Sequence, residues 1–359
     1  MSFNPNWTSH PGATIQSVLF EKNVSVKEFA QRLEWSIDNV NRLINGSIPI
    51  DESLADRLQN TLGATKHFWL NRQSIYDSRC KILCEEKETW LNNLPVKDMI
   101  NRGLIARGKD VFQECLSFFG VENLQTWNDK YKDLSISFRK SPSYISEMSS
   151  VITWMRQAEI QTNNYVTKTW NKALFEELLQ TKIKSLIRVK NPSIFIPELI
   201  RLCAECGVRL AIVPCIGKCR ASGASSFITQ NNALMILSFR HLSDDHFWFT
   251  FFHEAGHLVM HDKRLRLEDN NGISECEEEL DANAFASEHL ISYDYRDELI
   301  NMRRNKRIII EFAQKAQVSP GIVIGQLQHL GYIRFEYLNS YKRYYSWDEI
   351  NKGLNKVMS

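Results

Sequence analysis

The 359-residue sequence has neither a long apolar run nor a strong excess of one charge. No stretch approaches the ~18–20 uninterrupted apolar residues that a transmembrane helix needs. Residues 1–7 lack both the basic stretch and the apolar core of a secretion signal. The 44 Lys and Arg side chains are nearly balanced by 42 Asp and Glu side chains, so the whole chain creates no field that attracts a membrane or a polyanion. We therefore expect a cytoplasmic protein with no membrane partner.

Cysteine is also sparse, with eight residues in the whole chain. This density is too low for a disulfide scaffold, so we expect reduced thiols. Apolar residues make up 43% of the sequence and charged residues 24%, which is close to the average of globular proteins and excludes wholesale disorder or a coiled coil. At ~150 residues per domain, the length predicts two or three domains.

The N-terminal 75 residues predict five short helices separated by turns. Ser25 with Glu28 has the pattern of a capping box, which opens the second helix. Ser36 and Asp51 can cap the third and fourth helices, and the fifth follows directly. These local signals predict a compact helical module at the start of the chain.

The rest of the chain changes pattern at about residue 200. The preceding residues, from about 76, are mostly helical in pattern and contain no chemical motif, and a helix is expected at residues 196–206. Three strands are then expected at residues 208–213, 226–229 and 233–239. Long helices are expected at residues 244–261 and 275–290, and further helices from about residue 308. The fold class predicted from this order is mainly α with a small β-sheet, that is, α+β.

Residues 253–257 read HEAGH, which fits the HExxH pattern. Side chains four residues apart lie on one face of a helix, so His253 and His257 can bind one metal ion. Glu254 lies between them in sequence and can act as the general base toward a water that the metal activates. Apolar residues surround the motif and predict a buried helix, in which a histidine pair needs a metal or a hydrogen-bond partner.

A catalytic Zn²⁺ site uses three protein ligands and one open position, so a third ligand is expected from another element. The acidic stretch at residues 277–286 is the candidate. Glu279 and Asn283 are four residues apart, and Glu279 could bind the metal while Asn283 orients a histidine. Asp281 is the rival ligand and has the shorter side chain. His261, four residues beyond the HExxH motif, could approach the site or could cap a carbonyl group.

The sequence HEAGHLVMH, followed by ELDANAFASEHLI, resembles the ImmA/IrrE group of zinc-dependent metallopeptidases. Residues 207–213, 222–224 and 233–238 resemble the small sheet of that group, and residues 318–329 resemble its tail. The second helix of the group usually reads Glu-x-Glu-Ala-Asn, and this chain has Asp281 at the second acid. That departure leaves Glu279 as the counterpart of the third ligand.

The resemblance implies a zincin-like fold over residues 195–359 and one Zn²⁺ per chain, bound by His253, His257 and Glu279. Glu254 is the implied catalytic base. The implied substrate is one particular protein, often a repressor or an antitoxin of the XRE type.

The N-terminal module carries a second resemblance. Short stretches at residues 10–15, 29–33, 45–50 and 68–73 resemble the HigA-type XRE helix-turn-helix antitoxins, and the likeness spans about residues 8–77. The resemblance implies that the helix at residues 36–44 enters the major groove of DNA. Because Val40, Leu43 and Ile44 are expected to face the core, the candidate base contacts are Ser36, Asp38, Asn39 and Arg42. Arginine can address guanine, asparagine adenine, and aspartate the cytosine amino group.

The charge of this module argues against tight DNA binding. Residues 1–75 contain seven Lys or Arg and seven Asp or Glu residues. This balance leaves no basic surface to strengthen DNA binding. We expect a homodimer that binds palindromic operator DNA, with an affinity that is weak and sensitive to salt. The alternative is a helical module that contacts proteins instead of DNA.

The cysteine spacings allow other interpretations. The pairs at 203/206 and 215/219 could belong to a zinc ribbon, but the apolar, strand-like run between them favours a sheet element instead. Cys80 and Cys84 are spaced as on a helix, and we expect them to be buried or inert.

Together these observations predict three segments: a helix-turn-helix domain at residues 1–77, a helical middle segment at residues 78–194 and a metallopeptidase domain at residues 195–359. The predicted function is a DNA-binding regulator fused to a zinc metallopeptidase that cleaves a repressor or antitoxin in a stress, toxin–antitoxin or antiviral defence circuit. The alternative is a transcriptional regulator whose peptidase fold only binds or senses a partner.

Overall fold

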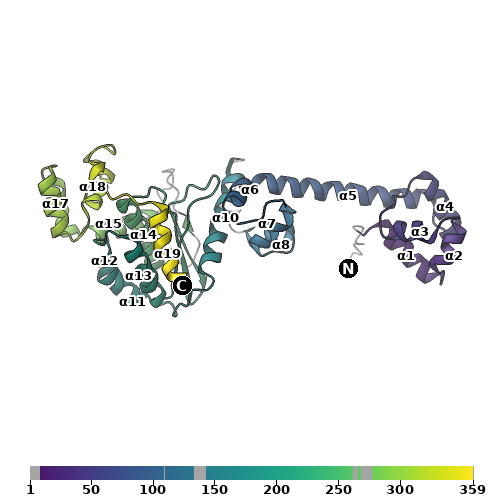
Figure 1. The fold of residues 1–359 in the computed structure, drawn as a ribbon, viewed down its shortest axis with the longest axis horizontal. Coiled ribbons are helices and arrows are strands. Elements are labelled where there is room, and N and C mark those ends of the chain that lie inside the picture. The colour runs from purple at the N-terminus through teal and green to yellow at the C-terminus, as the bar shows by residue number, and fades with distance from the viewer. Residues whose placement is uncertain (1–8, 109, 133–142, 262–265, 268–276, 359) are drawn as a thin grey trace. The chain divides into compact units, whose positions relative to one another are not determined.

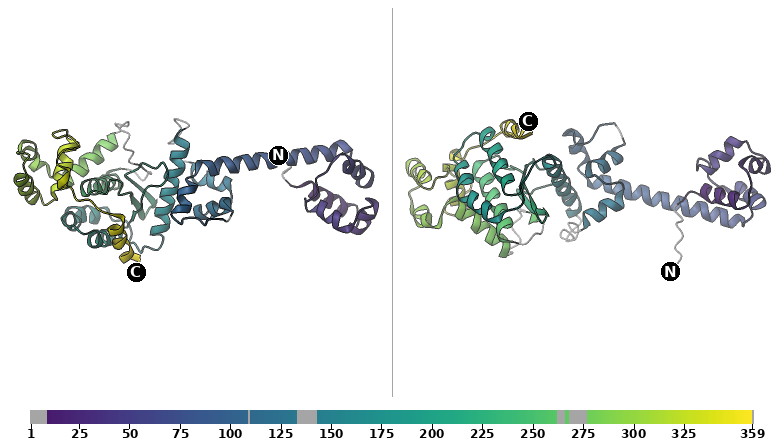
Figure 2. Two further views of the ribbon diagram at one scale, coloured as in Figure 1. Left: turned by 45° about the horizontal axis from the view of Figure 1, so that its top comes forward. Right: turned by 90° about the horizontal axis from the view of Figure 1, so that it is seen from below.

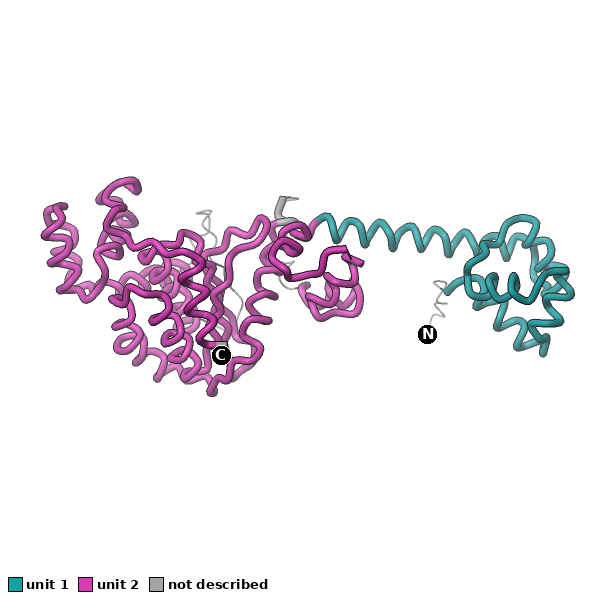
Figure 3. The backbone as a smooth tube through the Cα atoms, viewed as in Figure 1, with its two compact units in different colours: residues 1–92 teal, residues 93–359 magenta. Residues whose placement is uncertain are grey.

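The computed structural model describes residues 9–108, 110–132, 143–261, 266–267 and 277–358. The chain divides into two compact units, Met1–Asn92 and Asn93–Ser359 (Figure 3). Helices dominate both units, and a small sheet lies in the second, so the α+β class predicted from the sequence is confirmed. No helix in the described part of the chain combines the length and apolar character that crossing a membrane requires.

Helices build the described part of the first unit (Figure 1). They are α1 (Pro11–Glu21), α2 (Val26–Arg32), α3 (Ile37–Ile44), α4 (Glu52–Leu62) and α5 (Lys66–Asn93). The capping box of Ser25 and Glu28 is present, and Ser36 and Asp51 cap α3 and α4 through side-chain oxygens that accept backbone N–H bonds. The helix starts predicted from local signals are therefore confirmed.

A buried apolar cluster holds these helices together, and the buried Arg72 links the residues before α1 to α5. The cluster includes Ile15, Phe29, Val40, Leu58 and Trp69. The Arg72 side chain on α5 is 2% exposed and donates to the Ser9 hydroxyl at 2.8 Å and to the Ser9 carbonyl. Burial lowers the pKa of Arg72 from its usual value. These bonds fix the start of α1 against α5.

Helices also open the second unit. They are α6 (Val96–Asn101), α7 (Val111–Phe119), α8 (Leu124–Lys130), α10 (Ser143–Thr162), α11 (Lys172–Gln180), α12 (Lys182–Leu186) and α13 (Pro192–Glu205). Helix α13 begins at Pro192, four residues before the predicted start, and contains Pro197. A proline has no N–H for the carbonyl four residues earlier. The Lys356 ammonium donates to that carbonyl, Ser193 O, at 2.9 Å and so compensates for the missing bond.

The sheet has four strands in the order β1-β3-β2-β4. The strands are β1 (Val208–Ile212), β2 (Gly223–Thr229), β3 (Asn232–Leu237) and β4 (Arg266–Leu267). Strand β1 is parallel to β3, and β2 is antiparallel to both β3 and β4. The three predicted strands are present, but β2 starts at Gly223, three residues before the predicted start, because Gly223 pairs with Leu237 of β3.

Helix α10 covers the outer edge of β1 (Figure 2). The Gln161 amide accepts from Ile212 N at 3.0 Å and donates to Ile212 O at 3.2 Å, as a neighbouring strand would. The buried Trp154 indole donates to Val213 O at 2.8 Å. An open strand edge is a site for unwanted pairing, and this helix closes it. Residues N-terminal to 195 thus contribute to the same compact unit as the sheet.

The remaining helices complete the unit around α14 (Figure 1). They are α14 (Asp244–Met260), α15 (Glu277–Leu290), α16 (Arg296–Asn301), α17 (Lys306–Lys315), α18 (Pro320–His329) and α19 (Trp347–Met358). Helix α14 packs against β2 and β3 on one side and against α15 and α18 on others. The predicted helices at 244–261 and 275–290 are confirmed within the described residues, and residues 275 and 276 lie outside them.

Candidate metal centre

The HExxH motif lies in the interior of α14. His253, Glu254 and His257 are 1%, 0% and 4% exposed, because most residues of this helix are buried. The two histidine side chains lie one turn apart, and their Nε2 atoms are 3.0 Å from each other. Ring nitrogens this close indicate that both imidazoles point at one position.

Asn283 on α15 sets the orientation of the first histidine. The His253 Nδ1–H donates to Asn283 Oδ1 at 3.0 Å. A neutral imidazole that donates through Nδ1 keeps a lone pair on Nε2, so this bond presents His253 Nε2 as a ligand atom. The sequence predicted that Asn283 would orient a histidine, and the structure places it against His253.

Glu279, one turn before Asn283 on α15, faces both histidines. Its Oε2 atom is 3.2 Å from His253 Nε2, and its Oε1 atom is 3.3 Å from His257 Nε2. Carboxylate oxygens next to ring-nitrogen lone pairs need a positive charge between them.

These three side chains fit a divalent cation. Their ligand atoms all lie within 4.8 Å of one another, and no other group of three or more such side chains occurs among the described residues. Two imidazole nitrogens and one carboxylate form a donor set that suits Zn²⁺ with an open position. His253, His257 and Glu279 could therefore hold the metal.

Two rival residues from the sequence are outside the cluster of three ligands, although the His261 ring centroid lies 5.4 Å from that of His257. Asp281 is exposed and is not among the three clustered side chains. His261 Nε2–H donates to the backbone carbonyl of Glu278 at 3.0 Å, so its ring connects the end of α14 to α15. The geometry favours Glu279 over Asp281 and a capping role for His261.

Two glycines allow this close assembly. A Cβ atom on Gly256 would lie 3.2 Å from the Phe285 side chain of α15, so glycine permits the close packing of the two helices. A Cβ atom on Gly223 of β2 would lie 2.5 Å from Glu254 Oε1 and 2.7 Å from Thr250 Cγ2. The backbone of β2 therefore lies directly against the Glu254 carboxylate. The sequence gives no sign that Gly223 lies at the site, because a single glycine before the predicted strand carries no chemical signal.

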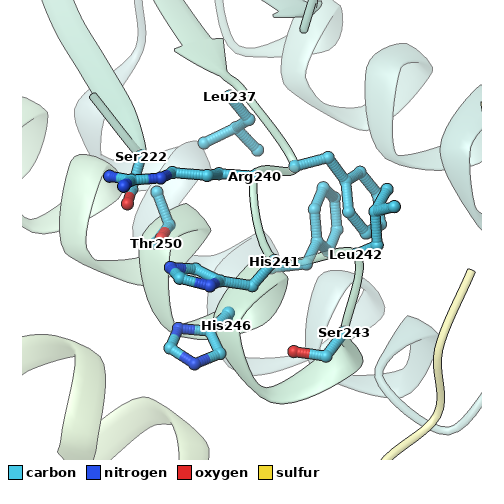
Figure 4. Close-up of a pocket in the computed structure, with 10 residues that line it drawn as sticks. Ser222, Leu237, Arg240, His241, Leu242, Ser243, His246 and Thr250 are labelled. Carbon is cyan, nitrogen blue, oxygen red and sulfur yellow. The ribbon is translucent and has the colours of Figure 1, made fainter. Parts of the chain in front are cut away.

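A small pocket lies next to this strand (Figure 4). Its lining includes Ser222, Arg240, His241, His246 and Thr250. The two imidazole rings stack with their centroids 4.1 Å apart. Desolvation by the surrounding protein lowers the pKa of His246 to about 4, so this ring is neutral near pH 7. Ser222 and Thr250 connect the pocket to Gly223, whereas its histidines are separate from the metal group.

The candidate DNA-contacting residues lie on α3. Val40 and Leu43 are fully buried, while Ser36, Asp38 and Arg42 are exposed and Asn39 is half-buried. The Ser36 hydroxyl accepts from Asn39 N at 3.2 Å, so it caps the helix. Three of the four side chains that the sequence places outward are exposed, and Ser36 also caps the helix.

The cysteine pairs do not form the predicted alternative, a zinc ribbon, in the described residues. Cys203 and Cys206 are fully buried, and the Sγ atoms of Cys215 and Cys219 lie 3.3 Å apart. No group of three or more metal-binding side chains in the described ranges includes any of them.

Two comparisons with known proteins find similarities to this chain. A family model of the IrrE N-terminal-like domain, peptidase M78, matches residues 221–327, which include β2, β3, α14 and α15. An uncharacterized HTH-type transcriptional regulator, YddM, of Escherichia coli (strain K12) is 35% identical over 66 residues, which are 18% of this chain and 70% of that protein. Through that stretch the chain belongs to the family of HTH-type transcriptional regulators, and it adds to it a domain similar to the M78 peptidases.

Proposed function

We propose that the chain is a DNA-binding regulator that carries a zinc-dependent peptidase. The observation that supports the peptidase best is the convergence of His253, His257 and Glu279 on one position, with Glu254 on the same buried helix. The donor set and the M78 match over residues 221–327 both favour Zn²⁺ at this position, one per chain. When bound, the cation supplies Lewis-acid activation of a water molecule and of a peptide carbonyl.

Three residues of this chain transfer the proton or position the groups that react. Glu254 takes the proton of the attacking water on its carboxylate and passes it to the leaving amine. Asn283 holds the His253 ring in the tautomer that presents Nε2. Gly223 leaves the space beside Glu254 free of a side chain, so the carboxylate can lie directly against β2.

The first unit supplies the DNA-binding part of the proposal. The HTH-type similarity supports operator DNA as a partner. On α3, the exposed Asp38 and Arg42, with Ser36 and Asn39 beside them, are the proposed base contacts. Because the two-fold symmetry of an operator mirrors that of the protein bound to it, the proposed form is a homodimer on palindromic DNA.

The proposed substrate is a repressor or antitoxin protein, and the proposed setting is a stress, toxin–antitoxin or antiviral defence circuit. The combination of a peptidase-like domain with a transcriptional-regulator domain in one chain supports such a substrate. The second candidate function is a regulator that does not cleave its partner, and a Glu254 substitution separates the two.

The test compares cells that express the full chain with cells that express its Glu254→Gln variant. New protein N-termini are identified by mass spectrometry in both. We expect at least one new N-terminus that depends on Glu254 and that persists in the control Glu277→Gln, because Glu277 is exposed on α15. Identical N-termini in all three samples, together with an unchanged cellular phenotype, would show that the protein acts without proteolysis.

The metal is tested separately on purified protein. Elemental analysis of the wild-type chain should give one zinc per chain, and His253→Ala should lose it. His246→Ala is the matched control, since His246 is on the same helix but lines the separate pocket. Full zinc content in His253→Ala would place the metal elsewhere.

A further inference from the structure

Cys215 and Cys219 lie in the loop between β1 and β2, outside the proposed metal centre. Their sulfur atoms are 3.3 Å apart, which is van der Waals contact or closer. Cys215 is half-buried and Cys219 is buried. A disulfide needs the two Cβ atoms at about 3.5–4.5 Å, and sulfurs already in contact need only a small movement to reach it.

A second cysteine pair in the chain has the same spacing but different geometry. Cys80 and Cys84 are also four residues apart, but both lie on α5. Residues four apart on a helix have Cβ atoms about 5–6 Å apart, which is too far for a disulfide. The loop between β1 and β2 therefore provides a proximity that the spacing alone does not.

The two thiols of the loop are chemically unequal. The Cys219 thiol donates to the Cys215 sulfur and so lowers the pKa of Cys215 below its usual value, while this contact raises the pKa of Cys219. The Ser238 hydroxyl and the nearby Arg240 and Arg102 guanidinium groups lower the pKa of Cys215 further. Cys215 is thus the more reactive nucleophile, and Cys219 is placed to resolve its oxidised form.

A metal is the less suitable occupant of this pair. Two thiolates satisfy only half of a structural zinc site, and the described residues place no third ligand with them. We propose that Cys215 and Cys219 are a redox-sensitive pair that a hydroperoxide converts to a disulfide, and that the disulfide lowers the activity of the adjacent peptidase site. The second half of this inference rests on the proposed peptidase function.

The oxidation proceeds in two balanced steps. The Cys215 thiolate attacks one peroxide oxygen, which breaks the O–O bond; Cys215 becomes a sulfenic acid, and the other oxygen leaves as water after it takes up a proton. The Cys219 sulfur then attacks the Cys215 sulfur, the S–S bond forms, and the sulfenic oxygen leaves as a second water. Two thiols and one hydrogen peroxide thus give one disulfide and two waters, and the two electrons lost by the sulfurs reduce the peroxide.

The coupling to the peptidase site runs through three consecutive residues. The Cys215 thiol donates to Ala221 O at 3.1 Å. Ser222 follows, and then comes Gly223, whose backbone lies against the Glu254 carboxylate. A disulfide sulfur has no proton to donate, so oxidation removes this one bond, while Ser222 O keeps its bonds from Ser238. The loss frees Ala221, two residues before the backbone that lies against Glu254, and so shifts the strand beside that carboxylate.

The chemical test uses the purified full chain treated with hydrogen peroxide and then with an alkylating reagent. Peptide mapping should find a Cys215–Cys219 disulfide, seen as the loss of two hydrogen atoms, and no Cys80–Cys84 disulfide. Dithiothreitol should reverse it. Amide hydrogen exchange at residues 216–225 should rise on oxidation in the wild type and stay unchanged in Cys215→Ser, which has no thiol at this position for the peroxide to attack. No disulfide between these residues, or equal oxidation of both pairs, would overturn the proposal.

The functional test uses the cleavage products that depend on Glu254 in expressing cells. Peroxide exposure should lower their yield by roughly tenfold or more in the wild type, since small displacements at a catalytic group have effects of this size. Cys215→Ser, in which the peroxide has no thiol to attack at this position, should keep the yield. A disulfide that forms without a change in yield would overturn the regulatory half. If no product depends on Glu254, the proposed peptidase function fails, while the mapping result still decides the disulfide.

Discussion

The helix caps of the first unit and the metal centre of the second unit depend on different kinds of contact. In the first unit, the caps at Ser25, Ser36 and Asp51 join residues three apart in the sequence. In the second unit, the contacts that form the metal centre join residues far apart, such as Asn283 and His253. Local signals can be predicted from a sequence, whereas contacts between residues far apart in the sequence are known only from the structure.

The candidate functional residues follow the same contrast. The proposed DNA contacts on α3 are largely exposed. Their contribution to DNA binding depends on the charge and shape of the helix surface. The proposed metal ligands His253 and His257 are buried, together with the Glu254 carboxylate. A buried polar cluster is costly unless its members bind something, so it is the stronger indication of function.

The largest expected effect on stability concerns a long-range contact. Trp154→Ala should destabilise the second unit by about 3–5 kcal/mol, because it leaves a cavity at a fully buried indole and removes its bond to Val213 O. In the first unit, Ser36→Ala should cost only about 1 kcal/mol, the effect of losing one cap. Calorimetry of both variants checks the comparison, with the 94% exposed Val166 changed to alanine as the control. Equal losses in the free energy of unfolding would mean that the local cap and the long-range buried indole contribute equally to stability.

Gly223→Ala should reduce the yield of Glu254-dependent cleavage products by roughly a hundredfold, since the added Cβ displaces the carboxylate. The bound zinc should remain, because Gly223 is not among the clustered ligands. Ser226→Ala, in the middle of the same strand, is the control. If Gly223→Ala loses zinc as well, the strand supports the whole centre and not Glu254 alone.

Much of the architecture was predictable from local patterns. The helix starts of the first unit, the three longer strands and the two helices of the metal centre follow from caps, apolar periodicity and turn residues. The early start of α13 has local signals, an Asn191 cap and Pro192 at the first position, but Pro197 has the competing pattern of a helix boundary. Its effect is compensated by Lys356, which lies far along the chain.

The candidate site was predictable in its ligands and not in its surroundings. HExxH spacing and the Glu279–Asn283 pair identify side chains that the fold then brings together. Gly223 and the Cys215–Cys219 contact depend on a strand and a loop meeting distant elements, and the sequence has no signal for such meetings. The three-segment division at residues 77 and 194 stays a prediction.

Asn283→Ala tests whether a contact between helices sets the metal affinity. Loss of the His253 Nδ1–H bond should weaken zinc binding by roughly 10- to 100-fold, the usual effect of removing a group that orients a ligand. Competition with a zinc chelator measures the affinity. Ser287→Ala, one turn further along the same helix, is the control. Equal affinities of Asn283→Ala and the wild type would mean that the ring needs no support from α15.

The smallest expected effect is at the exposed surface of the first unit. Arg42→Ala should weaken binding to a DNA fragment from the promoter of its own operon by roughly tenfold, because one base or phosphate contact is lost from α3. Arg32→Ala is the matched control, since Arg32 is also exposed and in the last turn of its helix, but on α2. Both variants remove one positive charge, so a shared loss reflects charge alone, and an additional loss in Arg42→Ala identifies α3 as the helix that reads the bases.

Titration in a gel-shift assay at several salt concentrations separates these two cases. A phosphate contact changes the salt dependence of the affinity, whereas a base contact changes the sequence preference. Arg42→Ala should therefore discriminate less well than Arg32→Ala between the promoter fragment and a scrambled fragment of the same length. If the two variants bind equally at every salt concentration, α3 does not carry the specificity and the first unit contacts DNA through another surface.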